Sequence, residues 1–215
     1  MPSPAVDPSS LQGVLLDLDQ TLFDRRPAWA SWVSTFGVDQ HDVLALLLKC
    51  DPVGHRPRRE LLEAVKTVFG LSSSVDELDA QLSRDLADHI DVDTDIASVL
   101  CELMERIPVG IVTNGGTVTQ RAKLKRIGLD HVPVVISGEV GVEKPEERIF
   151  YLGLNAIGVE AADANAVVFV GDDVVRDIEG ARSAGLQAVW SGANCEDTYD
   201  ILAALVGGLD RRKAC

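Results

Sequence analysis

Residues 13–19, with the sequence GVLLDLD, form a short apolar run that ends in two carboxylates. Such a run is typical of a buried strand in a parallel sheet, whose last residues emerge at the edge of the sheet. Side chains two positions apart on a strand point the same way, so Asp17 and Asp19 are expected to lie side by side. Two adjacent carboxylates repel each other and require a compensating cation or proton. By itself the pair is equally consistent with two solvated or helix-capping aspartates.

Four further apolar runs have the length of buried strands, at residues 107–112, 132–136, 166–170 and 187–190. Helical patterns occupy residues 117–127, 146–157 and 174–184, and each stops at a glycine, as is common after a helix end. This alternation predicts an α/β fold in which helices cover both faces of a parallel sheet.

One segment interrupts the alternation. Between about residues 24 and 89 there is no convincing strand, and apolar residues recur at helical spacing. We therefore expect an all-helical cap at residues 24–95, inserted into an α/β core of residues 13–23 and 96–215. Residues 1–12 are rich in proline and serine and are expected to form a flexible lead-in. The connections near Asp24 and at residues 91–95 are candidate hinges.

The composition is that of a globular protein, with 46% apolar and 25% charged residues, and the net charge is −14. This charge repels nucleic acid and anionic membranes, so we expect neither as a partner. No stretch approaches the roughly 18 apolar residues that span a bilayer. The four cysteines lack the spacing of a metal or redox motif, which favours reduced thiols and a cytoplasmic location. An acidic protein also repels phosphate esters, so a site for them needs local positive charge.

Polar residues follow other predicted strands as well. Thr113 and Asn114 end the second run, where a hydroxyl group, an amide and the backbone N–H groups of Gly115 and Gly116 can converge on an anion. For that motif alone, a plain turn is the simpler interpretation. Lys144 stands before a proline, a residue common at the first position of a helix, and alone it is most simply a solvated surface lysine.

Asp172 and Asp173 follow the fourth run, and Asp177 lies one turn into the next helix. Carboxylates gathered near one point suit Mg²⁺, while Asp173 is equally well explained as a helix cap. In open α/β sheets, ligands bind at the edge where the carboxyl ends of the strands meet. That edge would collect carboxylates, a hydroxyl group, N–H donors and a lysine, a set suited to phosphate groups.

These segments, in this order, resemble the four motifs of the haloacid dehalogenase superfamily. LDLDQTL at residues 16–22 resembles the first motif, DxDx[TV], and VTNG at residues 112–115 resembles the second. Lys144-Pro145 is similar to the third, and VGDD at residues 170–173 with Asp177 resembles the fourth. The resemblance spans about residues 13–190 and implies a Rossmann-like core, and the helical insertion resembles the small α-helical cap of one subclass.

The resemblance implies a Mg²⁺-dependent phosphatase for a small phosphorylated metabolite. Asp17 would attack phosphorus to form an aspartyl-phosphate, and Asp19 would protonate the leaving alcohol and then activate water. Thr113, the backbone of Asn114 and Lys144 would hold the phosphoryl group, and Lys144 would also offset the charge of the nucleophile.

The same resemblance implies a metal site. Mg²⁺ would be bound by Asp17, by the carbonyl group of Asp19 and by Asp172. Asp173 and Asp177 would support this site, with Asp177 acting through water or through Lys144.

Three alternatives stay open. A haloacid dehalogenase would use the same nucleophile, but its halide leaving group needs no proton, so Asp19 argues against it. A phosphomutase would share every core residue, and a catalytically idle binding protein would share the fold. Gln20 departs from the pattern, because glycine or asparagine often follows the second aspartate of this motif, and the chain still has to turn there.

The cap offers two candidate substrate contacts. The first is a concentration of arginines in an acidic chain, with solvated ion pairs as the simpler interpretation: Arg25, Arg26, Arg56, Arg58 and Arg59. The second is the pair Trp29 and Trp32, which helical spacing assigns to the cap core more readily than to a stacking platform.

Overall fold

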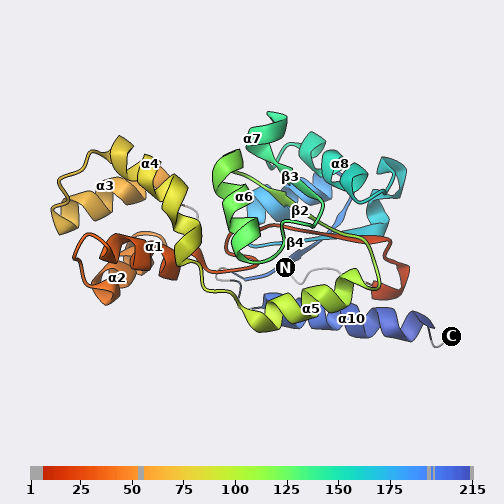
Figure 1. Cartoon of the computed structure of the whole chain (residues 1–215). Coiled ribbons are helices and arrows are strands. Elements are labelled where there is room, and N and C mark those ends of the chain that lie inside the picture. The colour runs from red at the N-terminus through yellow and green to blue at the C-terminus, as the bar shows by residue number, and fades with distance from the viewer. Residues whose placement is uncertain (1–6, 53–55, 193–194, 196, 214–215) are drawn as a thin grey trace. The chain divides into compact units, whose positions relative to one another are not determined.

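The computed structural model describes residues 7–52, 56–192, 195 and 197–213. Its centre is a five-stranded parallel sheet with the order β3-β2-β1-β4-β5 (Figure 1). The strands are β1 (Gly13–Leu16), β2 (Val109–Thr113), β3 (Val134–Ile136), β4 (Val167–Gly171) and β5 (Gln187–Trp190). All five lie where the apolar runs predict them. The α/β fold with a Rossmann-like parallel sheet is thereby confirmed.

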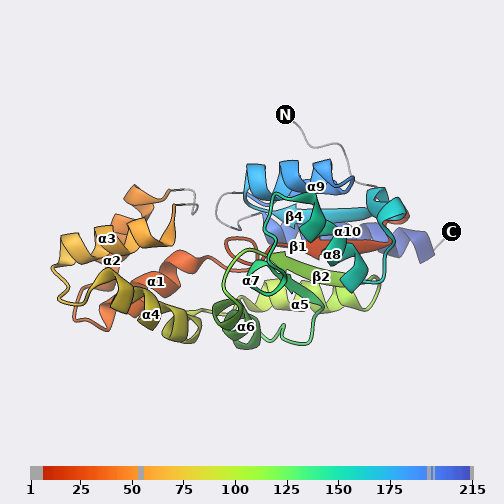
Figure 2. The same ribbon diagram turned by 90° about the horizontal axis from the view of Figure 1, so that it is seen from above.

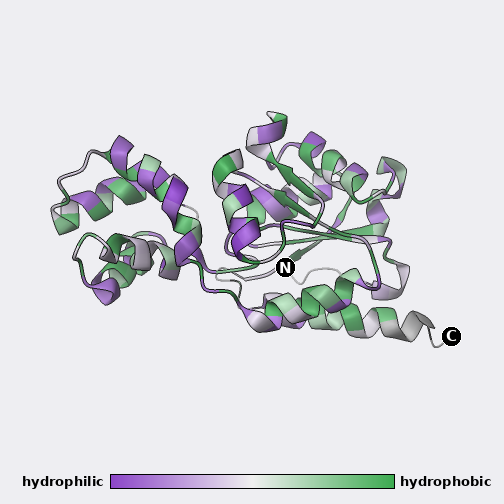
Figure 3. Cartoon of the chain, viewed as in Figure 1, coloured by the Kyte–Doolittle hydropathy of each residue, from purple (hydrophilic) through white to green (hydrophobic). Residues whose placement is uncertain are grey.

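Helices cover both faces of this sheet (Figures 1 and 2). On one face lie α8 (Glu147–Ala156) and α9 (Gly180–Ser183), which share a core with the sheet in which Phe150 packs edge-on against Phe169 at 5.2 Å. On the other face α5 (Thr94–Met104) and α10 (Thr198–Lys213) lie side by side, and both are hydrophobic over much of their length (Figure 3). Short elements complete this part of the chain: η1 (Pro8–Ser10), α7 (Ser137–Val140), η3 (Ala161–Ala166) and η4 (Val174–Glu179).

Two helix predictions need correction. The helix that follows Pro145 begins at Glu147 with Glu146 as its N-cap, so the proline precedes the cap and is not the first helical residue. The helix predicted at residues 174–184 is not uniformly α-helical, because η4 is a π-helix and only α9 is α-helical. The glycines expected after helices, Gly128, Gly158 and Gly185, all have positive φ.

The chain folds into two compact units. The first contains the sheet and comprises the chain up to Phe23, Asp93–Thr117 and the chain from His131 on. The second comprises Asp24–Val92 and Val118–Asp130, and the regular elements among its described residues are all helices. Its elements are α1 (Arg25–Ser34), α2 (Gln40–Cys50), α3 (Arg58–Phe69), α4 (Val75–Asp85), η2 (Leu86–His89) and most of α6 (Thr117–Arg126).

The second unit has its own core. Trp29 and Trp32 are 3% and 2% exposed, and Trp32 packs edge-on against Phe36 at 5.2 Å, which favours their interpretation as core residues. We predicted helix α6 as part of the core domain, but most of it belongs to the second unit. There, Nε of Arg126 donates to the carbonyl oxygen of Ile90 at 3.0 Å. The division into a core and a cap of residues 24–95 stays a prediction. Among the described residues, no helix combines the length and apolar character needed to cross a bilayer.

Candidate active site

Two of the predicted site residues, Asp17 and Asp172, follow strands that adjoin each other at the centre of the sheet. Asp17 comes directly after β1 and Asp172 directly after β4, and the backbone N–H of Asp17 donates to the carbonyl oxygen of Val170 at 2.9 Å. From β1 the chain continues to β2 and β3 on one side, and later to β4 and β5 on the other. Such a change of direction is where open α/β sheets bind ligands.

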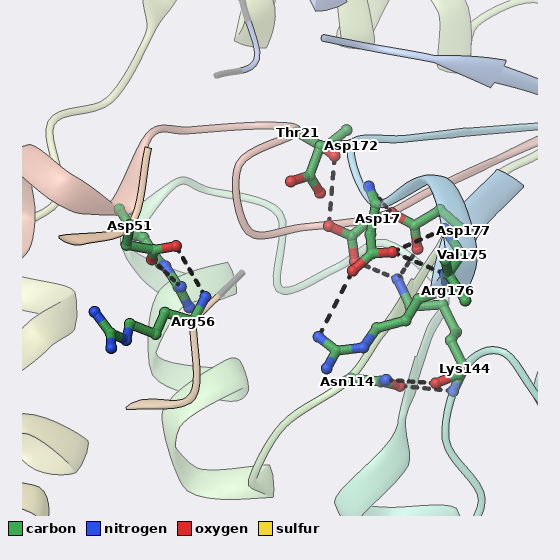
Figure 4. A network of polar contacts seen from close by, with 12 residues as sticks. Asp17, Thr21, Asp51, Arg56, Asn114, Lys144, Asp172, Val175, Arg176 and Asp177 are labelled. Atoms are coloured by element: carbon green, nitrogen blue, oxygen red, sulfur yellow. Dashed lines mark hydrogen bonds and ion pairs between the residues drawn. The ribbon is translucent and has the colours of Figure 1, made fainter. Parts of the chain in front are cut away.

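Lys144 is the centre of the charged cluster (Figure 4). Its ammonium group forms ion pairs with Oδ1 of Asp17 and, at 2.6 Å, with Oδ1 of Asp177. All three residues are buried, with Lys144 at 3% exposure. The interpretation of Lys144 as a solvated surface lysine is therefore wrong. Its Nζ also lies 5.3 Å from the centre of the Phe169 ring, which adds a favourable cation–π contact.

The side chain of Asn114 fixes the backbone of Lys144. Its Nδ2 donates to the carbonyl oxygen of Lys144 at 3.0 Å, and its Oδ1 accepts from the N–H of Lys144 at 2.8 Å. This reciprocal pair joins the end of β2 to a loop thirty positions further along the chain. The sequence predicted anion binding for the amide and the backbone of Asn114, and it did not predict this contact with Lys144. An asparagine carries the matching donor and acceptor for a peptide unit, but nothing in the sequence indicates which peptide unit it binds.

The backbone N–H of Gly115 already has a partner. It donates to Oγ of Ser137 at 2.9 Å, and the carbonyl oxygen of Gly115 accepts from the N–H of Gly138 at 3.1 Å. The expectation that this N–H converges on an anion is therefore not met. The side chain of Thr113 at the end of β2 is 1% exposed.

The fourth motif is organised by two aspartates with different tasks. Oδ1 of Asp173 accepts from the N–H groups of Val175 and Arg176, both at 2.9 Å, and so caps η4. Oδ2 of Asp177 accepts from the N–H of Asp173 at 3.0 Å, which holds this carboxylate next to Lys144. The carbonyl oxygen of Asp172 accepts from Nε1 of Trp190 at 2.6 Å.

Gly171 is required by the position of Asp177, which gives a first prediction. A Cβ at residue 171 would lie 2.6 Å from Cγ of Asp177, so Gly171→Ala must displace this carboxylate and disturb Lys144. We expect a loss of unfolding free energy of about 1–3 kcal/mol, as for other overpacked cores, measured by urea denaturation. Gly207→Ala in α10 is the matched control, because a Cβ there has no neighbour within 4 Å. Equal stability of the two variants would contradict this assignment.

The cluster carries more negative than positive charge. Asp17, Asp172 and Asp177 each place a carboxylate oxygen within 4.8 Å of the others, and Lys144 pairs with two of them. Burial raises the pKa of Asp17 well above its ordinary value, and the charges of Asp177 and Asp172 raise it further against the opposing effect of Lys144. Burial lowers the pKa of Lys144, but the charges of Asp17 and Asp177 outweigh it and leave this pKa raised, so the lysine stays protonated. Oxygen ligands and excess negative charge fit a hard divalent cation such as Mg²⁺.

Asp19 and Gln20 lie in a turn and not on a strand. Because β1 ends at Leu16, the alternation of side chains along a strand does not determine the directions of the Asp17 and Asp19 side chains. The backbone of Asp19 instead forms an isolated β-bridge with that of Phe23. Gln20 turns the chain with φ of 62°, a conformation that glycine and asparagine adopt more readily. Oγ1 of Thr21 lies 3.4 Å from Oδ2 of Asp17.

Each of the five cap arginines is paired with a carboxylate in the second unit. The pairs, with their N–O distances, are Arg25–Asp51 at 3.2 Å, Arg26–Asp24 at 2.8 Å, Arg56–Glu60 at 3.0 Å, Arg58–Asp79 at 2.7 Å and Arg59–Asp76 at 2.7 Å. These contacts favour the interpretation of the arginines as ion pairs of the helical unit.

The fold is therefore a parallel α/β domain with a buried cluster of one lysine and three aspartates at the edge of the sheet where open α/β folds bind ligands. The model of the haloacid dehalogenase-like hydrolase family matches residues 14–191, and the chain belongs to this family.

Individual relatives match parts of the chain. Phosphoserine phosphatase from Thermus thermophilus is 44% identical over 86 residues, which cover 39% of this chain and 33% of that protein. N-acylneuraminate-9-phosphatase from Homo sapiens is 37% identical over 109 residues, 49% of this chain and 43% of that protein. The chain thus spans less than half the length of these relatives. Among solved structures, a HAD phosphatase from Thermococcus onnurineus superposes with a TM-score of 0.61 and 27% identity, covering 92% of this chain and 99% of that one.

Proposed function

We propose that the protein is a Mg²⁺-dependent phosphatase that hydrolyses a small phosphorylated metabolite. The observation that carries the proposal is the buried ammonium group of Lys144 between Asp17 and Asp177, beside Asp172, at the central strand ends. It supplies the local positive charge that an acidic protein needs in order to bind a phosphate ester. The relatives from Thermus thermophilus and Homo sapiens are named as phosphatases, which supports the same reaction class.

In the proposed mechanism, a carboxylate oxygen of Asp17 attacks phosphorus while the bond to the leaving alkoxide breaks. Asp19 gives its proton to the oxygen of the leaving group, so that the alcohol departs and the phosphoryl group stays on Asp17 as an aspartyl-phosphate. Asp19 then takes a proton from water, whose oxygen attacks phosphorus and releases inorganic phosphate from Asp17. Thr113 and the backbone of Asn114 hold the phosphoryl oxygens, and the side chain of Asn114 keeps Lys144 in place to balance their charge.

We assign Mg²⁺ to Asp17, Asp172 and the carbonyl group of Asp19. When bound, the ion neutralises charge on the phosphoryl group and its nucleophile. Asp177 lies within the same carboxylate cluster, but its two oxygens are engaged by Lys144 and by the N–H of Asp173, so we give it the task of orienting Lys144. Asp173 supports the site by capping η4.

The test is phosphate release from a panel of phosphorylated metabolites, with Mg²⁺ and with EDTA. We expect release that depends on Mg²⁺, because the excess negative charge at Asp17 otherwise opposes an anionic substrate. Halide release from 2-haloacids would identify a dehalogenase, and isomerisation of a sugar phosphate without phosphate release would identify a phosphomutase. A folded protein that binds phosphate esters and turns over none of them would indicate a binding role.

A further inference from the structure

Thr198 connects the C-terminal helix to the loop that follows the candidate nucleophile. It is the first residue of α10 and lies beyond residues 14–191, the range matched by the family model. Its Oγ1 donates to the carbonyl oxygen of Thr21 at 2.8 Å, although 177 positions separate the two residues. Both residues have 0% exposure, so water does not replace this hydrogen bond in the folded protein.

The turn that Thr198 contacts contains Asp19 and directly follows Asp17. Within it, the N–H of Gln20 donates to the carbonyl oxygen of Phe23 at 2.9 Å, and the N–H of Leu22 donates to that of Leu18 at 3.0 Å. Gln20 has φ of 62°, a region that glutamine rarely occupies and in which its surroundings must hold it. The bond from Thr198 to Thr21 is such a restraint, and Oγ1 of Thr21 in turn lies 3.4 Å from Oδ2 of Asp17.

The other end of the restraint is firmly anchored. Helix α10 buries Leu202, Leu205, Val206 and Leu209, and it packs with α5. Just before α10, the N–H of Asp197 donates to the carbonyl oxygen of Ser191 at 3.4 Å, and the N–H of Ser191 donates to that of Gly171 at 2.9 Å. The start of α10 is therefore tied to the end of β4, the strand that Asp172 follows.

We propose that Thr198 is a positioning residue for the phosphatase reaction proposed above: through Thr21, its hydroxyl group holds the carboxylate of Asp17 in register with the Asp172 side of the site. A nucleophile displaced by an ångström loses much of its reactivity, because the attacking oxygen no longer lies in line with phosphorus. The C-terminal helix is then part of the catalytic apparatus although it lies outside the family match.

The test compares Thr198→Val, which keeps the shape and loses the hydroxyl group, with Thr198→Ser, which keeps the hydroxyl group. For Thr198→Val we expect kcat to fall by about ten- to a hundredfold with little change in KM. We also expect weaker Mg²⁺ binding in calorimetric titrations with the metal alone, since Asp17 is a proposed ligand. Thr198→Ser should stay within about threefold of the wild type in both measurements. Thr35→Val is the matched control, because it removes a hydroxyl-to-carbonyl bond, here 2.7 Å long, in the other unit.

The outcomes separate this inference from the proposed function. Wild-type kcat and wild-type Mg²⁺ affinity in Thr198→Val, with only a lower Tm, would overturn the positioning role and leave the phosphatase intact. If the wild type releases no phosphate but Thr198→Val still weakens Mg²⁺ binding, the phosphatase proposal fails and the restraint on Asp17 stands. If Mg²⁺ binding is equal in both proteins and neither is active, both proposals fail.

Discussion

Asp17→Asn is expected to reduce Mg²⁺-dependent phosphate release by at least about a thousandfold, because an amide can neither attack phosphorus nor form the aspartyl-phosphate. The loss should appear in kcat with the best substrate of the panel. Asp163→Asn is the matched control, since it is the same change at an exposed residue of the same unit. Turnover of Asp17→Asn at a tenth of the wild-type rate would remove Asp17 from the role of nucleophile.

The same substitution should not destabilise the metal-free protein. Burial raises the pKa of Asp17 in the folded state above its ordinary value of 3.8, so the folded state holds this proton more strongly than the unfolded state. The extra proton binding therefore stabilises the folded wild type below about pH 4. As pH rises through the raised pKa, the free energy of unfolding falls because this proton is lost, and above that pKa the decrease is complete. Asp17→Asn removes this pH-dependent decrease, because an amide does not ionise. In EDTA at pH 8 its Tm should equal or exceed that of the wild type, and the difference should shrink at pH 5. A Tm several degrees below that of the wild type at pH 8 would show that the charge pair with Lys144 outweighs the burial of Asp17.

The three central strands were predictable because each is buried on both faces, so the sequence of each is a largely apolar run. β1, β2 and β4 are buried at every position. The π-helix η4 was not predictable from the apolar pattern, because the side-chain contacts at its start are those of carboxylates. Oδ1 of Asp173 accepts from the N–H groups of Val175 and Arg176, and Oδ2 of Asp177 accepts from the N–H of Asp173. A pattern of apolar residues contains no sign of these contacts. The position of α6 in the second unit was not predictable either, because it depends on tertiary contacts such as that of Arg126 with Ile90.

The candidate site was predictable to the extent that it depends on topology. Residues that end or follow parallel strands meet at one edge of a sheet, and this brings Asp17 and Asp172 together and places Thr113 at the same edge. The contacts between loops were beyond prediction, because no local spacing encodes them. Asn114 binding the backbone of Lys144 and Thr198 binding Thr21 are of this kind. Asp177 was expected to act through water or through Lys144, and the structure has the direct ion pair.

Lys144→Met is expected to lower the free energy of unfolding by about 3–5 kcal/mol and the Tm by roughly 10 °C, and to abolish detectable turnover. Methionine fills a similar volume, so the effect comes from charge and not from a cavity. Without the ammonium group, the buried carboxylates of Asp17, Asp172 and Asp177 face one another with no cation among them. Lys125→Met at an exposed position is the control and should change stability by less than about 0.5 kcal/mol.

If uncompensated negative charge lowers the free energy of unfolding of Lys144→Met, removing one carboxylate should restore part of that free energy. Lys144→Met combined with Asp177→Asn should be more stable than Lys144→Met alone by about 1–3 kcal/mol, although Asp177→Asn by itself removes a partner of Lys144 and destabilises. Lower pH should act in the same direction. Carboxylates without a cation bind protons more readily, so the deficit of Lys144→Met should narrow between pH 8 and pH 5. A deficit that is independent of pH, and that the second substitution does not reduce, would mean that Lys144 contributes through packing against Phe169 and not through the charge balance of the site.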